Sequence, residues 1–515
     1  MQLDRWPLDP ADYDKQIPQK DYLALQVPAD LKPLQAKAPP PFDQASGKIK
    51  LSLEQAVYAA LRGNRELMVQ QYKPMIAGAF EQIERGAFDP ELFAELLYSE
   101  ERTSEVSRST EEQFNVQATD SFGILGLRQR LPTGTTVELS ASQERNTSNR
   151  TPEQQDTRLG LSVTQSLLRG LGPVVNLVAV RQAELETQAS LYELRGFTEA
   201  TLAEAEIAYW EFVLAEREIS IFQRSLEVAR QQLQEIEQRI EVGMLPNIEA
   251  AAARAEVARR EQAMIEAQSA LEDRRLKLLR IVNPAGGLGI EVRSTSNPGI
   301  SPQPITDVAS RVAVAQRVRP DLNEARLRWR QNRLETIATR NGLLPKLDLF
   351  VVLGKTGYAQ SFGESVSNLD GPNYDIAAGL RLSQYLGNRE AKGRHTAALA
   401  TARQAAAAVE NLTQLVGLDV RLAANQVGRA RRQISATRLT RELQEQTVEA
   451  EKERFDVGKS TSLLVAQAQR DLLASQINEA QAILYYRIAL VRLYLAEGSL
   501  LERRGVEVAK GQDLL

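Results

Sequence analysis

Alternation of apolar and polar residues marks two separate regions of this chain as β-strands. In residues 136–143, Val137, Leu139 and Ala141 alternate with polar side chains, and the same period of two recurs at 159–164 and 347–353. A period of two places every second side chain on one face of a sheet, so these strands have one apolar and one polar face. We expect strands within about 92–166 and about 347–384.

Long stretches with a helical pattern follow both strand regions. Residues 174–242 and about 390–457 predict two helices, each roughly 100 Å long at 1.5 Å per residue. Gly243 and Pro246 end the first, and Gly458 ends the second. Return helices are expected up to Val282 and Glu497. Helices of this length must bury their apolar stripes along neighbouring helices. The sequence therefore predicts long helical hairpins at about 174–282 and about 390–497.

The order of helix, strands and long helical hairpin occurs twice, which indicates an internal duplication. Pro90 recurs 255 residues later as Pro345, whereas Gly160 recurs 219 residues later as Gly379. The first strand region is therefore 36 residues longer, and the turn at residues 131–134 indicates an inserted hairpin there. We divide the chain into an extended N-terminal tail (1–50), a first repeat (51–290), a second repeat (305–500) and a C-terminal tail (501–515).

Composition narrows the class of protein. Charged residues make up 25% and aromatic residues 5% of the chain, which favours long packed helices. The net charge of -4 offers no basic field for nucleic acid. Cysteine is absent and His395 is the single histidine, so we expect no metal site. Residues 1–10 lack the basic start and apolar core of a signal peptide; an exported protein would have lost its signal, or begin upstream.

No group of residues points to catalysis, and we expect the protein not to be an enzyme and to need no cofactor. The triplet Gly458-Lys459-Ser460 imitates the end of a phosphate-binding loop. Glu453 stands where such a loop requires its first glycine, and no strand precedes it. We therefore expect no nucleotide site, and any transport must be energised by a partner.

Four short motifs follow one another in a recognisable order. They are LSLEQA at 51–56 with Asn64 and Leu67, QSLLRG at 165–170, Arg239-x-x-Val242-Gly243, and Arg454-Phe455-x-Val457-Gly458. Their order and duplication over about residues 51–500 resemble the TolC-like outer membrane factors, the outer membrane efflux protein family. The resemblance implies a mainly α fold in a homotrimer, with a shared membrane β-barrel and a trimeric α-barrel of long helical hairpins.

Strands in lipid must close into a barrel, because an open edge leaves backbone groups unpaired in hydrocarbon. Two to four strands per repeat cannot close alone, so copies related by rotation must share the barrel. Four strands per subunit give twelve in a trimer, as in the family. The inserted hairpin either joins this barrel and raises the number or extends outside it.

The resemblance also implies a role for the two helix-turn tips, which in the family meet the hairpins of periplasmic adaptor (membrane fusion) proteins. A tip glycine has a sufficient structural role as well, because it lets the chain reverse at the end of a helix. The expected adaptor-contact residues are Val242, Gly243, Met244, Leu245, Val457, Gly458, Lys459 and Ser460.

Some family members narrow their periplasmic entrance with aspartates six and nine residues after the second tip glycine. Leu464 and Gln467 occupy these positions here, so that acidic ring is missing. Glu249, six residues after Gly243, could form a threefold ring that selects cations, or could be an ordinary exposed carboxylate. Phe455 could instead form an apolar constriction.

The expected function is that of an outer-membrane channel with a long periplasmic extension. It would belong to a tripartite efflux or type I secretion system and conduct substrates passively from the periplasm or an inner-membrane pump. The implied partners are two further copies, an adaptor, that pump and outer-membrane lipid. The alternative is a periplasmic coiled-coil adaptor or scaffold without a pore. Alternating strands between the helices of both repeats argue against this alternative, since an adaptor carries a compact β-domain beside one hairpin.

Overall fold

The computed structural model describes residues 48–506 apart from 107–110, 112, 285–286 and 297–301. Most of the tail expected at 1–50, and residues 507–515, lie outside the described residues. The chain divides into two compact units. One unit, here the sheet unit, comprises residues 74–190 and 325–409. The other, here the helical unit, comprises the described residues within 1–73, 191–324 and 410–515.

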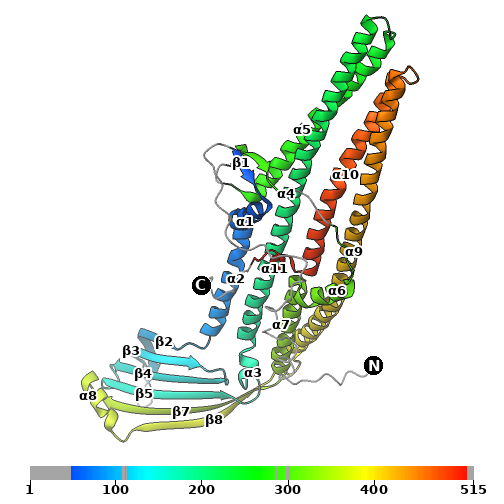
Figure 1. The fold of residues 1–515 in the computed structure, drawn as a ribbon. Coiled ribbons are helices and arrows are strands. Elements are labelled where there is room, and N and C mark those ends of the chain that lie inside the picture. The colour runs from blue at the N-terminus through cyan, green and yellow to red at the C-terminus, as the bar shows by residue number, and fades with distance from the viewer. Residues whose placement is uncertain (1–47, 107–110, 112, 285–286, 297–301, 507–515) are drawn as a thin grey trace. The chain divides into compact units, whose positions relative to one another are not determined.

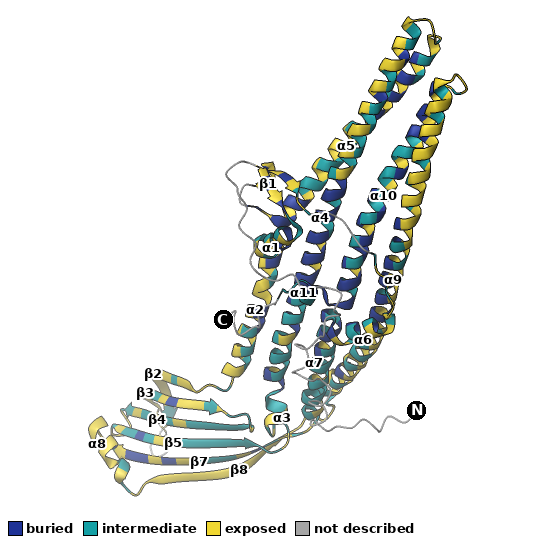
Figure 2. Cartoon of the chain, viewed as in Figure 1, coloured by how far each residue is buried: buried dark blue, intermediate teal, exposed yellow. Residues whose placement is uncertain are grey.

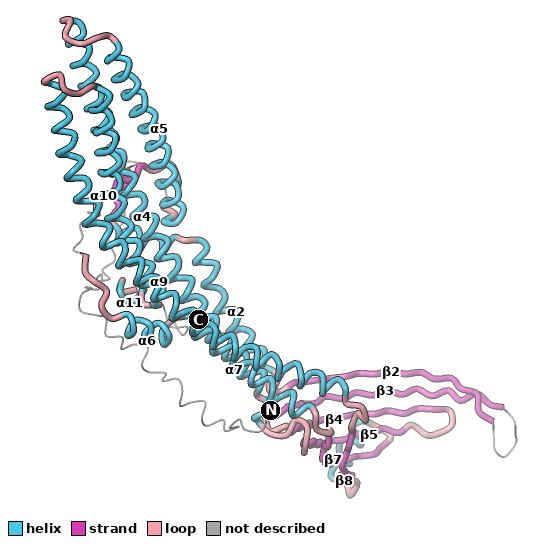
Figure 3. The backbone as a smooth tube through the Cα atoms, turned by 90° about the vertical axis from the view of Figure 1, so that its right-hand side faces the viewer, coloured by secondary structure: helices cyan, strands magenta, loops and turns pink. Residues whose placement is uncertain are grey.

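Six antiparallel strands form the centre of the sheet unit. In spatial order they are β2 (Glu91–Val106), β3 (Gln113–Arg130), β4 (Thr135–Ser148), β5 (Gln154–Ser166), β7 (Lys346–Ala359) and β8 (Tyr374–Ser383). The first repeat thus supplies four strands and the second supplies two, and β5 pairs with β7 to join them. The inserted hairpin lies within the sheet rather than outside it. The strands are drawn side by side in Figures 1 and 3.

The two faces of this sheet differ in polarity. One row of directly paired residues crosses all six strands and consists entirely of Leu and Ile: Leu92, Leu127, Leu139, Leu161, Leu353 and Ile376. Side chains of this apolar face are largely unburied, and Leu92 is 73% and Ile376 66% exposed. The opposite, polar face carries ion pairs between neighbouring strands, such as Arg128 with Glu138 (Nε–Oε2, 2.8 Å).

The connection from β7 to β8 contains regular structure. Strand β7 continues to Ala359, and a short helix α8 (Phe362–Ser367) and a 3-10 turn (Asn368–Asp370) follow. The Ser365 side chain is fully buried against the sheet, where its hydroxyl lies 2.7 Å from that of Thr157. The close approach requires Gly357, because a Cβ there would lie 2.0 Å from the Ser365 carbonyl oxygen.

Helices account for most of the remaining described chain. The first repeat contains α1 (Leu53–Gly63), α2 (Arg65–Gly86), α3 (Pro173–Asn176), α4 (Val178–Glu241) and α5 (Ile248–Val282). The second contains α6 (Val308–Val318), α7 (Pro320–Gly342), α9 (Arg389–Asp456) and α10 (Ser462–Glu497), followed by α11 (Leu500–Arg503). The predicted long hairpins are therefore present as α4–α5 and α9–α10, and they confirm the duplicated order. The first long helix was predicted to begin at residue 174. In the structure a separate short helix, α3, occupies Pro173–Asn176, and α4 begins after Leu177.

The core of the helical unit lies where α1, α4, α5 and α10 meet a small parallel sheet. This sheet pairs β1 (Lys48–Leu51) with β6 (Glu291–Ser294). Tyr209, Phe212 and Leu484 are at most 1% exposed at the centre, and buried residues follow the facing stripes of the long helices (Figure 2). The Tyr209 hydroxyl donates to the Leu51 carbonyl oxygen at 3.0 Å, which ties β1 to α4.

The C-terminal region from 501, expected to be a tail, begins as a buried helix. Leu500 and Leu501 are at most 1% exposed, so α11 packs into the helical unit. Buried ion pairs surround it, and we call this group the C-terminal ion-pair cluster. Its members are Arg195, Glu199, Glu206, Arg311, Glu497, Glu502, Arg503 and Arg504. This helix could not be predicted from the sequence, because its four residues are too few to show a helical period.

Glu199 is the member of this cluster whose ionisation is most affected. Burial raises the pKa of its carboxyl from 4.5 to about 8, because Arg195, 3.4 Å away, only partly offsets the loss of solvation. The folded state then holds the proton more tightly than the unfolded state, so Glu199 contributes stability below about pH 4.5 that is lost as the pH rises towards 8.

Replacing this carboxyl with an amide should therefore flatten the pH profile of stability. We expect Glu199→Gln to remain as stable at pH 8 as at pH 5, whereas the parent protein loses stability over that range. Thermal unfolding followed by circular dichroism at a series of pH values measures the effect. Equal pH profiles for the two proteins would contradict it.

Candidate functional site

The first hairpin tip is shaped by a glycine in a left-handed conformation. Gly243, with φ of 75°, follows α4, and its amide donates to the Ile240 carbonyl at 2.9 Å. The Met244 amide donates to the Arg239 carbonyl at 2.8 Å. These two bonds satisfy the last carbonyls of the helix and reverse the chain. Val242 and Met244 are left 68% and 76% exposed at the turn.

The second tip repeats this geometry. Gly458 also has φ of 75°, its amide donates to Phe455, and the Lys459 amide donates to the Arg454 carbonyl at 2.7 Å. Val457 is 69% exposed, as its counterpart Val242 is. The structure therefore places the eight predicted adaptor-contact residues in two matched turns. Exposed apolar side chains next to reversed backbone are suited to bind another protein, although contact with an adaptor remains a prediction.

Neighbouring side chains differ between the tips. The Ser460 hydroxyl donates to the Glu451 carboxylate at 2.8 Å, and Thr461 caps α10 by accepting from the Leu464 amide. Leu245 and Pro246 stand at the corresponding place after the first tip, and Asn247 makes no side-chain cap for α5. The second turn is thus held by polar side chains that the first turn lacks.

The two hairpins are joined to each other just behind their tips. Arg239 on α4 lies between Asp456 and Phe455 on α9: its Nη2 is 2.7 Å from Asp456 Oδ1, and its guanidinium lies 5.4 Å above the Phe455 ring. Phe455, predicted as a possible constriction, is therefore half-buried under an arginine of its own chain. Sequence reasoning missed this pairing because the two residues come from different repeats.

Glu249 makes a second link between the hairpins. Its Oε2 accepts from the Ser462 amide at 3.2 Å and from the Ser462 hydroxyl. Ser462 begins α10, so a half-buried carboxylate from the first hairpin sits at the positive end of a helix in the second. The Glu249 carboxylate is thus hydrogen-bonded within the protein and is not the freely solvated side chain of the alternative interpretation. Leu464 and Gln467, in contrast, are exposed on α10.

A buried ion pair behind this link was also missed. Glu256 and Arg260 are 6% and 4% exposed on α5, with 2.7 Å between Glu256 Oε1 and Arg260 Nη2. Arg470 of α10 lies 4.0 Å from the same glutamate. Burial lowers the pKa of Arg260, while Glu256 opposes that shift. In the sequence, only the spacing of four residues between Glu256 and Arg260 indicates an ion pair. This spacing is the same for buried and for surface pairs.

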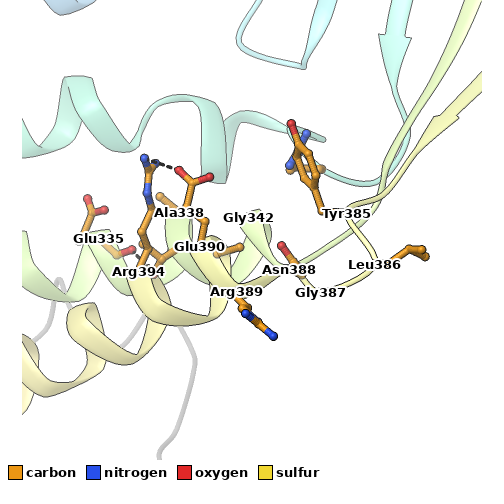
Figure 4. Close-up of a pocket in the computed structure, with 13 residues that line it drawn as sticks. Glu335, Ala338, Gly342, Tyr385, Leu386, Gly387, Asn388, Arg389, Glu390 and Arg394 are labelled. Atoms are coloured by element: carbon orange, nitrogen blue, oxygen red, sulfur yellow. Dashed lines mark hydrogen bonds and ion pairs between the residues drawn. The ribbon is translucent and has the colours of Figure 1, made fainter.

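A groove within the sheet unit does not resemble a catalytic site. It measures about 590 Å³ and lies where the end of β8 leads into α9, with Tyr385, Leu386 and Arg389 along it (Figure 4). Its polar contacts include an exposed ion pair between Glu390 and Arg394 at 2.7 Å. His395, nearby on α9, lies 3.2 Å from the Thr339 hydroxyl. Across the described ranges, no three His, Cys, Asp or Glu side chains are grouped so as to hold a metal ion.

No helix in the described part of the chain combines the length and the apolar character needed to cross a membrane.

The sequence profile of the outer membrane efflux protein family matches residues 129–283 and 312–499, which include both helical hairpins. The chain therefore belongs to the outer membrane efflux protein family. This membership confirms the resemblance to the TolC-like factors, a class of channel proteins. Among curated proteins, none matches this sequence.

Solved structures of outer-membrane proteins share the fold. The outer-membrane channel OprN is 18% identical, with a TM-score of 0.66 over 87% of this chain and 90% of its own. The CmeC outer membrane channel of Campylobacter jejuni is 17% identical, with a TM-score of 0.64 over 87% and 86%. VceC from Vibrio cholerae is 16% identical, with a TM-score of 0.64 over 87% and 96%. The predicted fold, mainly α with a strand region and a long helical hairpin in each of two repeats, is thus confirmed.

Proposed function

We propose that this protein is the outer-membrane channel of a tripartite efflux or type I secretion system and conducts substrates passively out of the periplasm. The observation that carries this proposal is that one chain of this family contains both a sheet with one apolar and one polar face and two long helical hairpins. The apolar face suits contact with lipid, and the polar face suits a water-filled interior. An inner-membrane pump would supply the energy.

A homotrimer is the assembly that we propose, because single helices of this chain leave long apolar stripes unburied. On α2 the stripe consists of Met68, Tyr72, Met75, Ile76, Phe80 and Ile83, each between 40% and 64% exposed. On α9 it consists of Leu415, Leu418, Leu422, Leu439 and Leu443. Spacings of three and four residues place the α2 stripe on one helix face, and the same spacings recur within 415–422 and within 439–443 on α9. A neighbouring copy can cover these apolar faces.

Fractionation and electrophysiology test the function. We expect the protein in the outer membrane as a detergent-stable trimer, with ion conductance in planar bilayers. Recovery as a soluble monomer would contradict the proposal, and a membrane-bound trimer without conductance would favour the scaffold instead.

Glu249→Gln should alter ion selectivity if this carboxylate lines the entrance. An unchanged selectivity would leave Leu464 and Gln467, on the exposed face of α10, as the proposed lining.

The tips are the proposed contact with a periplasmic adaptor, since Val242, Met244 and Val457 are exposed and apolar. Burying a charge in place of such a side chain is costly. We expect Met244→Asp combined with Val457→Asp to weaken adaptor binding at least tenfold, as measured by co-purification and by drug or substrate efflux from cells. Thr440→Asp, roughly 25 Å along α9 from the second tip, should leave binding unchanged. Equal adaptor binding by both variants would mean that the tips are not the contact surface.

A further inference from the structure

From the sheet unit we propose that β2 of one copy pairs with β8 of the next, so that the membrane channel is a closed sheet of eighteen strands. This inference rests on the trimer of the proposed function. The observations concern the two edges of the sheet, the polarity of its faces and the direction of its strands. Together they make each copy contribute six strands instead of the four typical of the family.

The two edges of the sheet have no neighbouring strand in the part of the chain that the structure describes. Among the described residues, β2 pairs only with β3 and β8 pairs only with β7, so each edge has one row of backbone groups without a strand partner there. In hydrocarbon such groups cost several kcal/mol each unless another strand satisfies them. Because six strands alternate in direction, β2 and β8 run antiparallel to each other, and rotation of the copy brings the two edges together in an antiparallel pair.

The first two strands carry the same lipid-facing pattern as the other four. The paired row of Leu and Ile side chains runs without interruption from Leu92 on β2 to Ile376 on β8. On β2, Leu92 and Leu96 are 73% and 89% exposed on this face. A hairpin that projected into water would expose these Leu and Ile side chains to solvent, which is unfavourable. The pattern therefore places all six strands in the wall that faces lipid.

One chain is too small to enclose a channel on its own. Eight strands already fill their interior with side chains, whereas sixteen to eighteen leave an aqueous passage. The polar face needs such water, because it carries the Arg158–Asp375 pair, with Nη2 2.6 Å from Oδ2. Six strands from each of three copies give eighteen. Since barrel diameter grows roughly linearly with strand number, this sheet is about one and a half times as wide as one of twelve strands.

Cysteine pairs test which strand is the edge, and the chain has no cysteine of its own. Ala94→Cys on β2 is combined in turn with Tyr374→Cys, Ile376→Cys, Ala378→Cys, Leu380→Cys and Leu382→Cys, which all lie on the apolar face of β8. Oxidation in outer-membrane fractions should link copies at one or two of these positions and yield covalent trimers on denaturing gels. Ala377→Cys, on the opposite face of β8, should not link to position 94.

A second series identifies the competing arrangement. If the β2–β3 hairpin lay outside the wall, β4 would be the edge, and Ala141→Cys would link to β8 in place of Ala94→Cys. Links from 141, or no link from 94 at any of the five positions, would overturn the eighteen-stranded sheet while leaving an outer-membrane trimer intact. Loss of the trimer from the membrane in the parent protein would overturn the proposed function instead. Electron microscopy of the purified trimer should count eighteen strands.

Discussion

Leu139→Arg should prevent stable assembly of the protein in the outer membrane. Leu139 lies on β4 in the middle of the apolar row and is 56% exposed within one chain. An arginine facing the middle of a bilayer destabilises a membrane sheet by about 2–4 kcal/mol. In the proposed trimer three copies carry the change, so we expect little or no heat-resistant trimer in membrane fractions, as measured on semi-native gels.

The neighbouring residue provides a matched control. Ser140 lies on the polar face of the same strand, paired with Gly126 and Gly160, so an added guanidinium would face the polar side of the sheet instead of lipid. We expect Ser140→Arg to assemble at nearly the level of the parent protein. Equal loss of trimer in both variants would mean that the sheet does not separate lipid from water in the way described above.

Arg504→Met should destabilise the helical unit by about 3–5 kcal/mol, because it leaves a buried carboxylate without its partner. Glu206 on α4 is completely buried, and its Oε2 lies 2.7 Å from Arg504 Nη2. Chemical unfolding of the detergent-solubilised protein, followed by circular dichroism, measures the loss. A buried charge is costly when it is alone, so the double variant Glu206→Met with Arg504→Met should recover most of the stability.

An exposed ion pair serves as the comparison. Arg394 and Glu390 are paired at 2.7 Å but are 74% and 75% exposed on α9, so water screens them. Arg394→Met should leave the unfolding transition almost unchanged. If Arg504→Met were equally mild, α11 would not be anchored through this pair.

The elements with a strong period were predictable from sequence. The predicted second return helix coincides with α10 (Ser462–Glu497), since Gly498 in a left-handed conformation ends it where the pattern stops. The full length of β2 was not predictable, because its outer half is polar on both faces and shows no alternation. The pairing of β1 with β6 joins segments of four residues that lie far apart in sequence, and neither is long enough to show a period.

The site was predictable only in part, for a related reason. A glycine between two helical patterns identifies a reversal, so both tips could be found from Gly243 and Gly458. The partners of Glu249 and Phe455 could not, because each lies in the other repeat. Sequence periodicity describes which face of a helix is apolar, but the packing of one hairpin against another decides which side chains remain free.

The even number of strands added to the first repeat has an evolutionary consequence. A hairpin inserted into the sheet preserves the direction of both edge strands, whereas a single added strand would make β2 and β8 parallel and spoil their pairing around the ring. A lineage can therefore widen its membrane pore by duplicating one hairpin, in steps of two strands per gene product. The helices and their tips need not change, so the bore and the docking partner can be selected separately.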